Sequence, residues 1–379
     1  MNFDDENVPP ENLPETLIRD RTDSSMHFRK KIPVGILGAT GCVGQKLIEL
    51  LKKHPWFEIT ALTGSEKSQG KSYKDAVNWM QTTLLPEEIG KIKISATEPN
   101  IPCKIVFSAV SSDVAGEIES KFASHGYAVI SLASAHRMDA DVPLLVPEVN
   151  ADHLKLIDTQ KTKKSGKGGF IVAKPNCAVA GLVLALRPLA LEFGLEKVHV
   201  VTMQSSSGAG IPGVPSLALL DNIIPYIEGE EEKVEIEPQK ILGELKIDQI
   251  EPYKLTISAS CNRVPVTEGH FEVCSIKLKE KASISDIKRA WREFFPPIQE
   301  LKLPSSPASI LHYFEEKDFP QPKLHRDLEK GMGVSIGRLR PCPLFDYKFD
   351  ILSHNMVRGA SGGAILMAEL LVKNGYIFW

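Results

Sequence analysis

Residues 32–44 read IPVGILGATGCVG, an apolar run followed at once by a glycine-rich turn. The run 32–37 has the length and composition of a buried strand, and residues 45–53 then carry their leucines and isoleucine at helical spacing. Glycine lets the backbone turn sharply and approach a pyrophosphate closely, while the start of a helix presents free N–H groups and a partial positive charge. The stretch therefore predicts a strand, a turn and a helix that together bind the phosphates of a dinucleotide.

The glycines of this turn are spaced GxxGxxG rather than in the more common GxGxxG pattern. The alternative is a tight strand–helix turn without a ligand, but the strand before it and the amphipathic helix after it favour nucleotide binding. The residues of the turn that we expect to contact a cofactor are Gly38, Thr40, Gly41, Cys42, Val43 and Gly44.

The end of the second expected strand bears on which nicotinamide cofactor is bound. Domains that select NAD usually place an acidic residue there, which holds the ribose 2′-hydroxyl. Here residues 63–70 read TGSEKSQG, and Ser65, Lys67 and Ser68 can hold the 2′-phosphate of NADP. Glu66 favours NAD instead, because a carboxylate repels that phosphate. For Lys67 the alternative interpretation is an ordinary solvated surface lysine that does not bind the cofactor. We therefore predict NADP, with NAD as the open alternative.

Further apolar strands follow the first and alternate with helices, at residues 57–62, 104–108 and 128–132. This order predicts a parallel, doubly wound sheet. Later in the chain, residues 197–203 and 272–279 alternate as half-buried antiparallel strands do. We thus predict an α/β protein in which a Rossmann-type dinucleotide-binding domain is joined to an α+β domain.

A length of 379 residues suits about two domains. The predicted divisions are a mobile, polar N-terminal extension at 1–30, a dinucleotide-binding domain at 31–175 and 356–379, and a catalytic and dimerisation domain at 176–355. Within the first domain, residues 160–169 read QKTKKSGKGG and predict an exposed basic connection. The final stretch predicts a long apolar helix that returns to pack on the dinucleotide-binding domain.

The composition argues against several classes of protein. A formal net charge of −3 gives no general electrostatic attraction to nucleic acid or to an anionic membrane, and no apolar run is long enough to span a bilayer. The N-terminus does not read as a secretory signal. The 6 cysteines are scattered without a CxxC pair, which predicts reduced thiols in a cytoplasmic protein rather than disulfides or a metal site.

One cysteine differs from the others in its setting. Residues 174–181 read KPNCAVAG, so that Cys177 opens an apolar helix. There the helix dipole and free N–H groups lower the pKa of a thiol, and the same groups can hold the oxyanion of a tetrahedral intermediate. Cys177 is therefore the candidate nucleophile. The cysteines predicted to be small buried residues are Cys42, Cys103, Cys274 and Cys342.

A third motif, RVPVTEGHFEV, separates Arg263 from His270 by a short predicted strand and a turn. Arginine is the natural bidentate partner of a substrate carboxylate, and histidine carries protons near neutral pH. Taken alone, His270 reads more often as a surface or core residue. The presence of a candidate nucleophile and an arginine in the same sequence favours a role for His270 in proton transfer.

Four motifs follow one another along the chain: GATGCVG, PNCAVAG, QSSSGAG and RVPVTEGH. In this combination the sequence, from about Lys31 to Tyr376, resembles the aspartate-semialdehyde dehydrogenase family. The likeness is to its fungal and archaeal branch, through the Ala-Val that follows the cysteine and the segment IPYIEGEEEK. The resemblance implies a fold like that of glyceraldehyde-3-phosphate dehydrogenase and a homodimer or homotetramer. It also implies reduction of aspartyl-4-phosphate to aspartate semialdehyde by NADPH, with release of phosphate, in lysine, threonine and methionine synthesis.

The resemblance also implies roles for particular residues. The catalytic residues are the nucleophile Cys177, the acid–base residue His270, and Gln204, which orients the substrate. The substrate-binding residues are Arg263 for the α-carboxylate, Glu230 for the amino group, and Arg137, Lys233 and Asn176 around the phosphate. The further cofactor contacts are Ser108, Ser207, Gly208 and Asn355. Glu230 belongs to an acidic run that can also be a solvated face, and Glu231 is its rival. Glu66 and Lys67 depart from the serine and arginine expected beside the NADP phosphate.

Two other kinds of protein stay open at this point. A related reductase of N-acetyl-glutamyl-phosphate or malonyl-CoA would keep the cysteine, the histidine and the glycine-rich turn. Arg263 with a nearby acid better suits a free α-amino acid, because an acetylated amine has no ammonium group to pair. A non-catalytic dinucleotide sensor would need the turn but not the catalytic residues.

Overall fold

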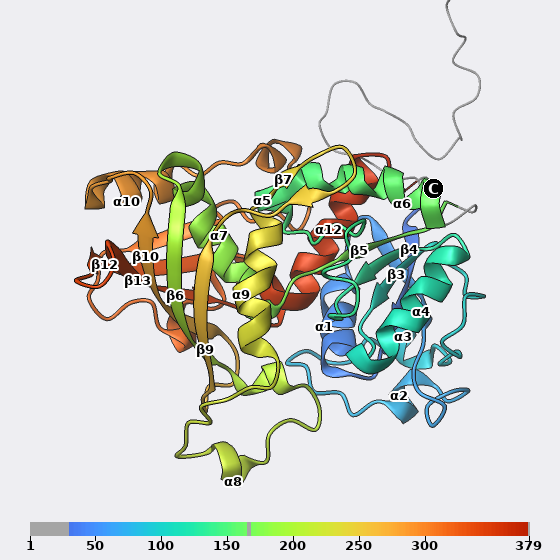
Figure 1. Cartoon of the computed structure of the whole chain (residues 1–379). Helices are drawn as coiled ribbons and strands as arrows, with labels where there is room; N and C mark the ends of the chain where they lie inside the picture. Colours follow the sequence, from blue (N-terminus) through green and yellow to red (C-terminus); the bar gives the residue numbers. More distant parts are fainter. Residues whose placement is uncertain (1–29, 165–167, 378–379) are drawn as a thin grey trace, which may run out of the picture.

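The computed structural model describes residues 30–164 and 168–377, which form two sheets with helices packed around and between them (Figure 1). The predicted N-terminal extension lies, apart from its last residue, outside the described residues. Within the described ranges, no helix is both long enough and apolar enough to span a membrane.

The first sheet is parallel and five-stranded, with the order β2-β1-β3-β4-β5. Its strands are β1 (Ile32–Leu37), β2 (Phe57–Leu62), β3 (Ile105–Ser108), β4 (Ala128–Ser131) and β5 (Phe170–Ala173). All of them except β2 are buried at every position, as expected for a parallel sheet covered by helices on both faces. The predicted doubly wound α/β unit is confirmed.

The second sheet is mixed and six-stranded, with the order β11-β12-β13-β10-β6-β9. Its strands are β6 (Leu195–Gln204), β9 (Thr256–Arg263), β10 (His270–Leu278), β11 (Leu311–Phe314), β12 (Val334–Pro341) and β13 (Tyr347–Ser353), and a separate hairpin joins β7 (Glu244–Leu245) to β8 (Ile250–Glu251). Strand β10 is antiparallel to both β6 and β13, as the alternating pattern predicted, but β6 and β9 run parallel.

The short strand predicted between Arg263 and His270 was wrong, because β9 ends at Arg263 and β10 begins at His270. The intervening segment contains Pro265, which has no N–H to donate to a ladder. It ends at Gly269, whose φ of 97° lies outside the extended region. A loop therefore connects the two strands.

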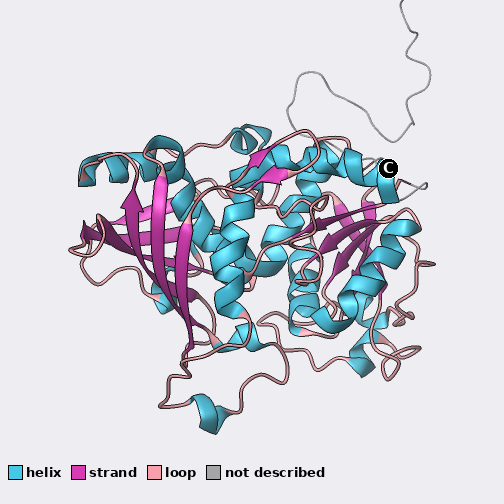
Figure 2. Ribbon diagram, viewed as in Figure 1, coloured by secondary structure: helices cyan, strands magenta, loops and turns pink. Residues whose placement is uncertain are grey.

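Helices cover the sheets and fill the space between them (Figure 2). Those of the N-terminal part are α1 (Cys42–Leu51), α2 (Tyr73–Ala76), α3 (Glu87–Lys91), α4 (Ser112–Ser124), α5 (Pro147–Asn150) and α6 (Leu156–Lys164). Those of the C-terminal part are α7 (Cys177–Glu192), α8 (Ser216–Leu219), α9 (Glu230–Ile241), α10 (Ile284–Arg292), α11 (Pro322–His325) and α12 (Gly362–Lys373). Shorter 3-10 turns are η1 (Ala151–Lys155), η2 (Ser206–Ala209), η3 (Pro297–Leu301) and η4 (Leu328–Gly331).

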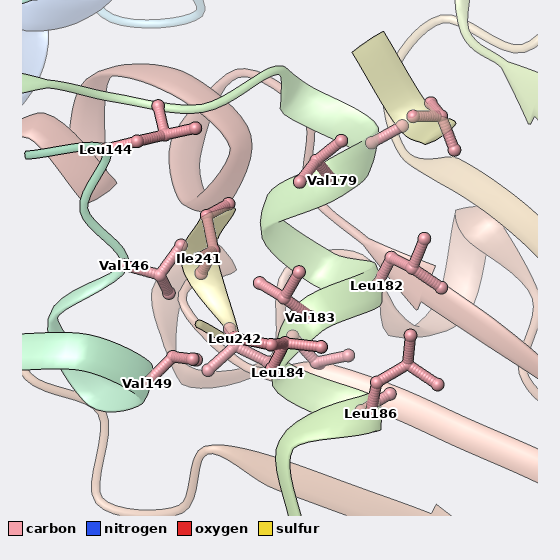
Figure 3. Close-up of a cluster of buried hydrophobic side chains, with 14 of the residues drawn as sticks. Leu144, Val146, Val149, Val179, Leu182, Val183, Leu184, Leu186, Ile241 and Leu242 are labelled. Atoms are coloured by element: carbon pink, nitrogen blue, oxygen red, sulfur yellow. The ribbon is translucent and has the colours of Figure 1, made fainter. Parts of the chain in front are cut away.

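Helix α7 lies in the largest apolar cluster, between the second sheet and the rest of the molecule (Figure 3). Its side chains pack against Ile241 at the end of α9 and the following Leu242, and against the segment around Leu144 and Val146. Helix α7 is apolar on nearly every side. Burial of each of its buried leucines contributes about 1.5–3 kcal/mol to stability. This packing fixes the position of the helix start, where Cys177 lies.

Two elements of the structure differ from those predicted. The terminal apolar segment begins with a π-helical turn, η5 (Val357–Ser361), before α12 packs on α1 and β4. The predicted basic connection at 160–169 is partly helical, because α6 continues to Lys164. Lysine and glutamine are good helix formers, so a polar composition alone did not mark the end of the helix. Residues 165–167 lie outside the described residues.

Candidate active site

The ends of three neighbouring strands bring candidate residues together. In the register of the second sheet, Gln204 on β6 pairs with Arg263 on β9, and the start of β10 places His270 on the other side of Gln204. All three side chains are buried, and Arg263 donates from Nη1 to the carbonyl oxygen of Ser205 at 2.7 Å. Residues distant in sequence thus meet at one edge of the sheet.

The candidate nucleophile lies directly against the candidate acid–base residue. Cys177 Sγ is 3.0 Å from His270 Nε2. The other ring nitrogen, Nδ1, lies 3.1 Å from the backbone N–H of Ser205, which can only donate a hydrogen bond. Nδ1 is therefore the acceptor, and the proton of the neutral ring is on Nε2, facing the sulfur. In this arrangement His270 is a hydrogen-bond donor to Cys177.

The sequence predicted a lowered pKa for the thiol of Cys177, but in the structure this pKa is raised. Burial raises the pKa of Cys177 to about 11, and Glu230 adds to the rise, while Lys174 and two arginines oppose it. Burial also lowers the pKa of His270 to about 3, so its ring is neutral. The N–H of Ala178, one of the groups expected to hold an oxyanion, already donates to the side chain of Asn176 at 2.9 Å. Helix position alone is therefore outweighed by desolvation and by a neighbouring carboxylate.

Helix α9 presents a carboxylate to the cysteine. Glu230 Oε2 accepts from Asn176 Nδ2 at 2.8 Å and from Gln204 Nε2 at 3.1 Å, and Oε1 accepts from Lys233 at 2.9 Å. Burial opposes ionisation, but Lys233 and these amide hydrogen bonds outweigh it and hold the pKa of Glu230 below its usual value. Its rival Glu231 points elsewhere and accepts from the backbone N–H of Cys261 on β9. Glu230 is thus the ionised carboxylate of the site.

A second carboxylate of α9 joins the cation Arg137 to the cysteine loop. Glu237 Oε1 accepts from Arg137 Nη1 at 2.7 Å, and its Oε2 accepts from the backbone N–H of Asn176 at 2.7 Å. Glu237 was not among the site residues predicted from the sequence. The signal was present, because Glu230, Lys233 and Glu237 recur at i, i+3 and i+7, which places them on one helix face.

We expect Glu237→Gln to destabilise the protein and to weaken the interaction that keeps the guanidinium of Arg137 in place. The carboxylate and the guanidinium are both buried, so removal of one charge leaves the other unpaired, at a cost of about 3 kcal/mol in the free energy of unfolding. Urea denaturation measures this loss. Glu232→Gln, an exposed position on the same helix, is the control and should change little. Equal stability of the two variants would contradict the assignment.

Many of the candidate residues line one cavity of about 220 Å³, but Gln204, Arg263 and His270 are not among its lining residues. From the predicted set, the cavity is lined by Cys42, Val43, Arg137, Asn176, Cys177, Ser207, Gly208, Glu230, Lys233 and Asn355. The lining carries both signs of charge and also reaches the first turn of α1. Cys42, which was predicted to be buried, is only half-buried, as is Cys342, while Cys103 and Cys274 are buried as expected.

Two glycines make room in this cavity for the reacting groups. A side chain at Gly208 would place its Cβ 2.8 Å from Arg263 Nη1 and 3.3 Å from the ring of His270. A Cβ at Gly359, in the π-helical turn η5, would lie 2.9 Å from that of Cys177. Turns of this kind often occur at functional sites, and here η5 closes over the cysteine.

The glycine-rich turn has the features of a phosphate site. Gly38 has a φ of 73°, and Cβ atoms at Gly38 or Gly44 would lie 2.6 Å or less from backbone oxygens. At Gly41 the nearest atom would be 3.5 Å away, so this position opens outward. Gly41 precedes α1 without a side-chain cap, which leaves the N–H groups of the helix start free for a ligand. Thr40 lies half-buried in the same turn.

A separate cavity of about 700 Å³ lies beside the end of β2 and is lined by Ser65 and Lys67 together with Glu66 and Glu98. Ser68 does not line it, and its backbone N–H donates to the carbonyl oxygen of Ser65. One cation, Lys67, and two anions, Glu66 and Glu98, are therefore present where the 2′ end of a cofactor is expected.

The remaining predicted cofactor contacts differ in their accessibility. Asn355 Nδ2 donates to Ser207 Oγ at 2.8 Å, and its Oδ1 accepts from the N–H of Gly269 at 2.9 Å. This ties the loop before His270 to the cavity wall. Ser108, at the end of β3, is fully buried and lines neither cavity.

The sequence and the fold of this chain were compared with those of known proteins. Residues 33–157 match the model of the semialdehyde dehydrogenase NAD binding domain, and residues 186–358 match that of the semialdehyde dehydrogenase dimerisation domain. An aspartate-semialdehyde dehydrogenase of Archaeoglobus fulgidus is 48% identical over 345 residues, covering 91% of this chain and 99% of the relative. This chain belongs to the aspartate-semialdehyde dehydrogenase family.

Further members of the aspartate-semialdehyde dehydrogenase family support the same conclusion. The enzyme of Saccharomyces cerevisiae is 44% identical over 363 residues, covering 92% of this chain and 99% of the relative. The crystal structure of the Candida albicans enzyme with NADP has a TM-score of 0.85 and 41% identity, and covers 92% of this chain and 100% of that one. The family and its fungal and archaeal likeness, predicted from the four motifs, are confirmed.

Proposed function

We propose that the protein reduces L-aspartyl-4-phosphate to L-aspartate-4-semialdehyde with NADPH and releases inorganic phosphate, in the synthesis of lysine, threonine and methionine. The observation that carries this proposal is the 3.0 Å contact of His270 with Cys177, which lines a cavity together with a buried carboxylate and several cations. A thiol beside a proton donor suits acyl transfer, and the surrounding charges suit a phosphorylated amino acid.

The charges of the site match those of the proposed substrate. Arg263 would bind the α-carboxylate, Glu230 would bind the ammonium group, and Arg137 and Lys233 would bind the phosphate. An N-acetylated substrate has no ammonium group and would add no counter-charge to the buried Glu230, which is paired with Lys233 in the structure. This favours the free amino acid over the acylated alternative.

The residues divide the reaction into two steps. In the first, the thiol of Cys177 loses its proton to solvent and the sulfur attacks the acyl carbon. A thioester forms, the carbon–oxygen bond to phosphate breaks, and the departing phosphate takes up a proton. An ammonium group beside Glu230 would offset the charge that raises the thiol pKa, so the thiolate becomes accessible when substrate binds. Gln204 and Asn176, both bound to Glu230, would keep the acyl group in line with the sulfur.

In the second step, the hydride that reduces the thioester carbon would come from NADPH. His270 would give its Nε2 proton to the oxygen of the thiohemiacetal as that oxygen becomes negative. It would take the same proton back when the carbonyl of the aldehyde re-forms and the sulfur of Cys177 leaves as a thiolate. The turn at Gly38 to Gly44 would hold the pyrophosphate, and Ser65 and Lys67 the 2′-phosphate. Asn355, Ser207 and Gly208 would border the nicotinamide, close to the cysteine.

We further propose a division at 31–175 with 356–379, and at 176–355, into dinucleotide-binding and catalytic domains. We also propose a homodimer, with a homotetramer as its possible extension. The second domain matches a dimerisation model, and its strands carry half-exposed apolar pairs such as Phe271 with Met203. The six free thiols support a reducing compartment such as the cytoplasm.

The deciding experiment runs the reaction in reverse. Purified protein is mixed with aspartate semialdehyde, phosphate and either NADP or NAD, and reduced cofactor is followed by its absorbance. Phosphate-dependent reduction of NADP is the expected result. A folded protein that reduces neither cofactor would redirect attention to the acylated-substrate reductases, which the same assay tests with the corresponding semialdehyde.

We expect Arg263→Lys to raise KM for aspartate semialdehyde about tenfold to a hundredfold, with a smaller effect on kcat. Lysine keeps the charge but loses the two-pronged contact with a carboxylate, which is worth about 1.5–3 kcal/mol. Steady-state kinetics measure the change. Arg340→Lys, at a half-exposed ion pair on β12, is the control. An unchanged KM would count against Arg263 as the carboxylate-binding residue.

A further inference from the structure

A buried lysine lies beside the reacting cysteine and has no role in the steps above. Lys174 follows strand β5, is 3% exposed, and lines the same cavity as Cys177. Its Nζ donates to the carbonyl oxygen of Pro175 at 2.9 Å. Among the residues that the structure describes, no carboxylate lies within ion-pair distance of it. An ammonium group without a counter-charge is costly to bury, which calls for an explanation.

The backbone around Lys174 is arranged to keep the side chain in place. Its own N–H donates to the carbonyl oxygen of Ser131 on β4, which anchors the start of the cysteine loop. On the other side, a Cβ at Gly363 would come 3.2 Å from Lys174 Cε, so the absence of a side chain there makes room for the lysine stem. The nearby Arg358 is already paired with Glu148 at 2.6 Å.

We propose that Lys174 is a positioning residue of this site, whose buried ammonium group stabilises the thiolate of Cys177. This rests on the proposed function, in which that thiolate attacks an acyl phosphate. Three cations favour the thiolate: Lys174, Arg137 and Arg263. The two arginines are assigned to anionic groups of the substrate, so Lys174 is the cation that stays available to the sulfur throughout the reaction.

The neutral state of His270 strengthens this argument. A thiolate beside an imidazolium has its counter-charge in the histidine, but His270 Nδ1 accepts from Ser205 N–H and the ring carries one proton. The positive charge must come from elsewhere. The charged groups facing Lys174 are Cys177, Arg137, Glu237 and Arg358. Glu237 is bound to Arg137 and to a backbone N–H, so the thiolate is the uncommitted anion of this group.

The electrostatics of Lys174 agree with this geometry. Burial lowers its pKa to about 7, while Cys177 in its thiolate form acts in the opposite direction. An ionised Cys177 therefore widens the pH range in which Lys174 is charged. Because the coupling is reciprocal, the ammonium group lowers the thiol pKa by the same amount.

The test is the pH at which Cys177 ionises in the free protein. The rate of iodoacetamide labelling of Cys177, read by peptide mass spectrometry, and thiolate absorbance relative to Cys177→Ser both report it without turnover. We expect Lys174→Met to raise the midpoint by about one pH unit, so that labelling below the midpoint slows about tenfold. Lys174→Arg keeps the charge and should restore a midpoint near that of the native protein. Lys46→Met is the control and should not shift the midpoint, because Lys46 is a buried lysine of α1 that does not line the cavity around Cys177.

The outcomes separate this proposal from the proposed function. An unchanged midpoint in Lys174→Met overturns the role of Lys174 even if the enzyme reduces NADP as expected. A shifted midpoint with no turnover on aspartyl substrates would instead overturn the substrate assignment. If Lys174→Met does not fold, Lys174→Gln is measured against Lys174→Arg, and equal midpoints for that pair overturn the proposal.

Discussion

Cys177→Ser is expected to lower turnover at least about 10⁴-fold while binding of NADPH stays unchanged. A serine hydroxyl at this position has no thiolate to offer, and the thioester on which the reduction depends cannot form. The glycine-rich turn does not involve the sulfur, so cofactor affinity should persist. Reverse-direction activity and NADPH fluorescence titration measure the two effects separately.

The matched control for this variant is Cys342→Ser. Cys342 is half-buried in the turn that leads to β13 and lines no part of the cavity around Cys177. Its replacement should leave activity close to that of the native protein. Steady-state activity near the native level in Cys177→Ser would rule out the thioester mechanism.

The second large effect is expected for His270→Ala, with a loss of about 10²–10⁴ in kcat. The variant removes the Nε2–H group that faces the sulfur and the only proton donor that we assign to the thiohemiacetal oxygen. Because His270 does not bind the α-carboxylate in our assignment, KM should change much less than kcat.

His199→Ala provides the control for a histidine on the same sheet. His199 is half-exposed on β6, away from the buried ring of His270. Its replacement should leave kcat unchanged. A His270→Ala variant whose kcat stays within a factor of a few of the native value would show that the proton reaches the oxygen by another route, such as solvent.

Some features of the site could be predicted because they depend on neighbouring residues. The strand, glycine-rich turn and helix at 32–51 follow from hydrophobic spacing and from the backbone freedom of Gly38. The same reasoning placed Cys177 at the start of α7, since Asn176 caps the helix. Family membership followed from four such local motifs in order.

Other features could not be predicted, because they depend on residues that meet only in the folded chain. The direction of the Cys177 pKa is one example: helix position predicted a fall, but desolvation and the carboxylate of Glu230 raise it. The pairing of Arg137 with Glu237, which are 100 positions apart, is another. Ionisation depends on distance and burial, and neither is encoded by sequence spacing.

The sequence by itself determined the parallel sheet with its phosphate-binding turn, the position of the nucleophile and the family, because these reflect local geometry and periodicity. Only the tertiary structure decided which nitrogen of His270 carries the proton, which glutamate enters the cavity, and that Lys174 lies uncompensated beside the thiol. Each of these depends on the packing of α7 and α9 against two sheets, where low dielectric makes a single nearby charge or hydrogen bond decisive.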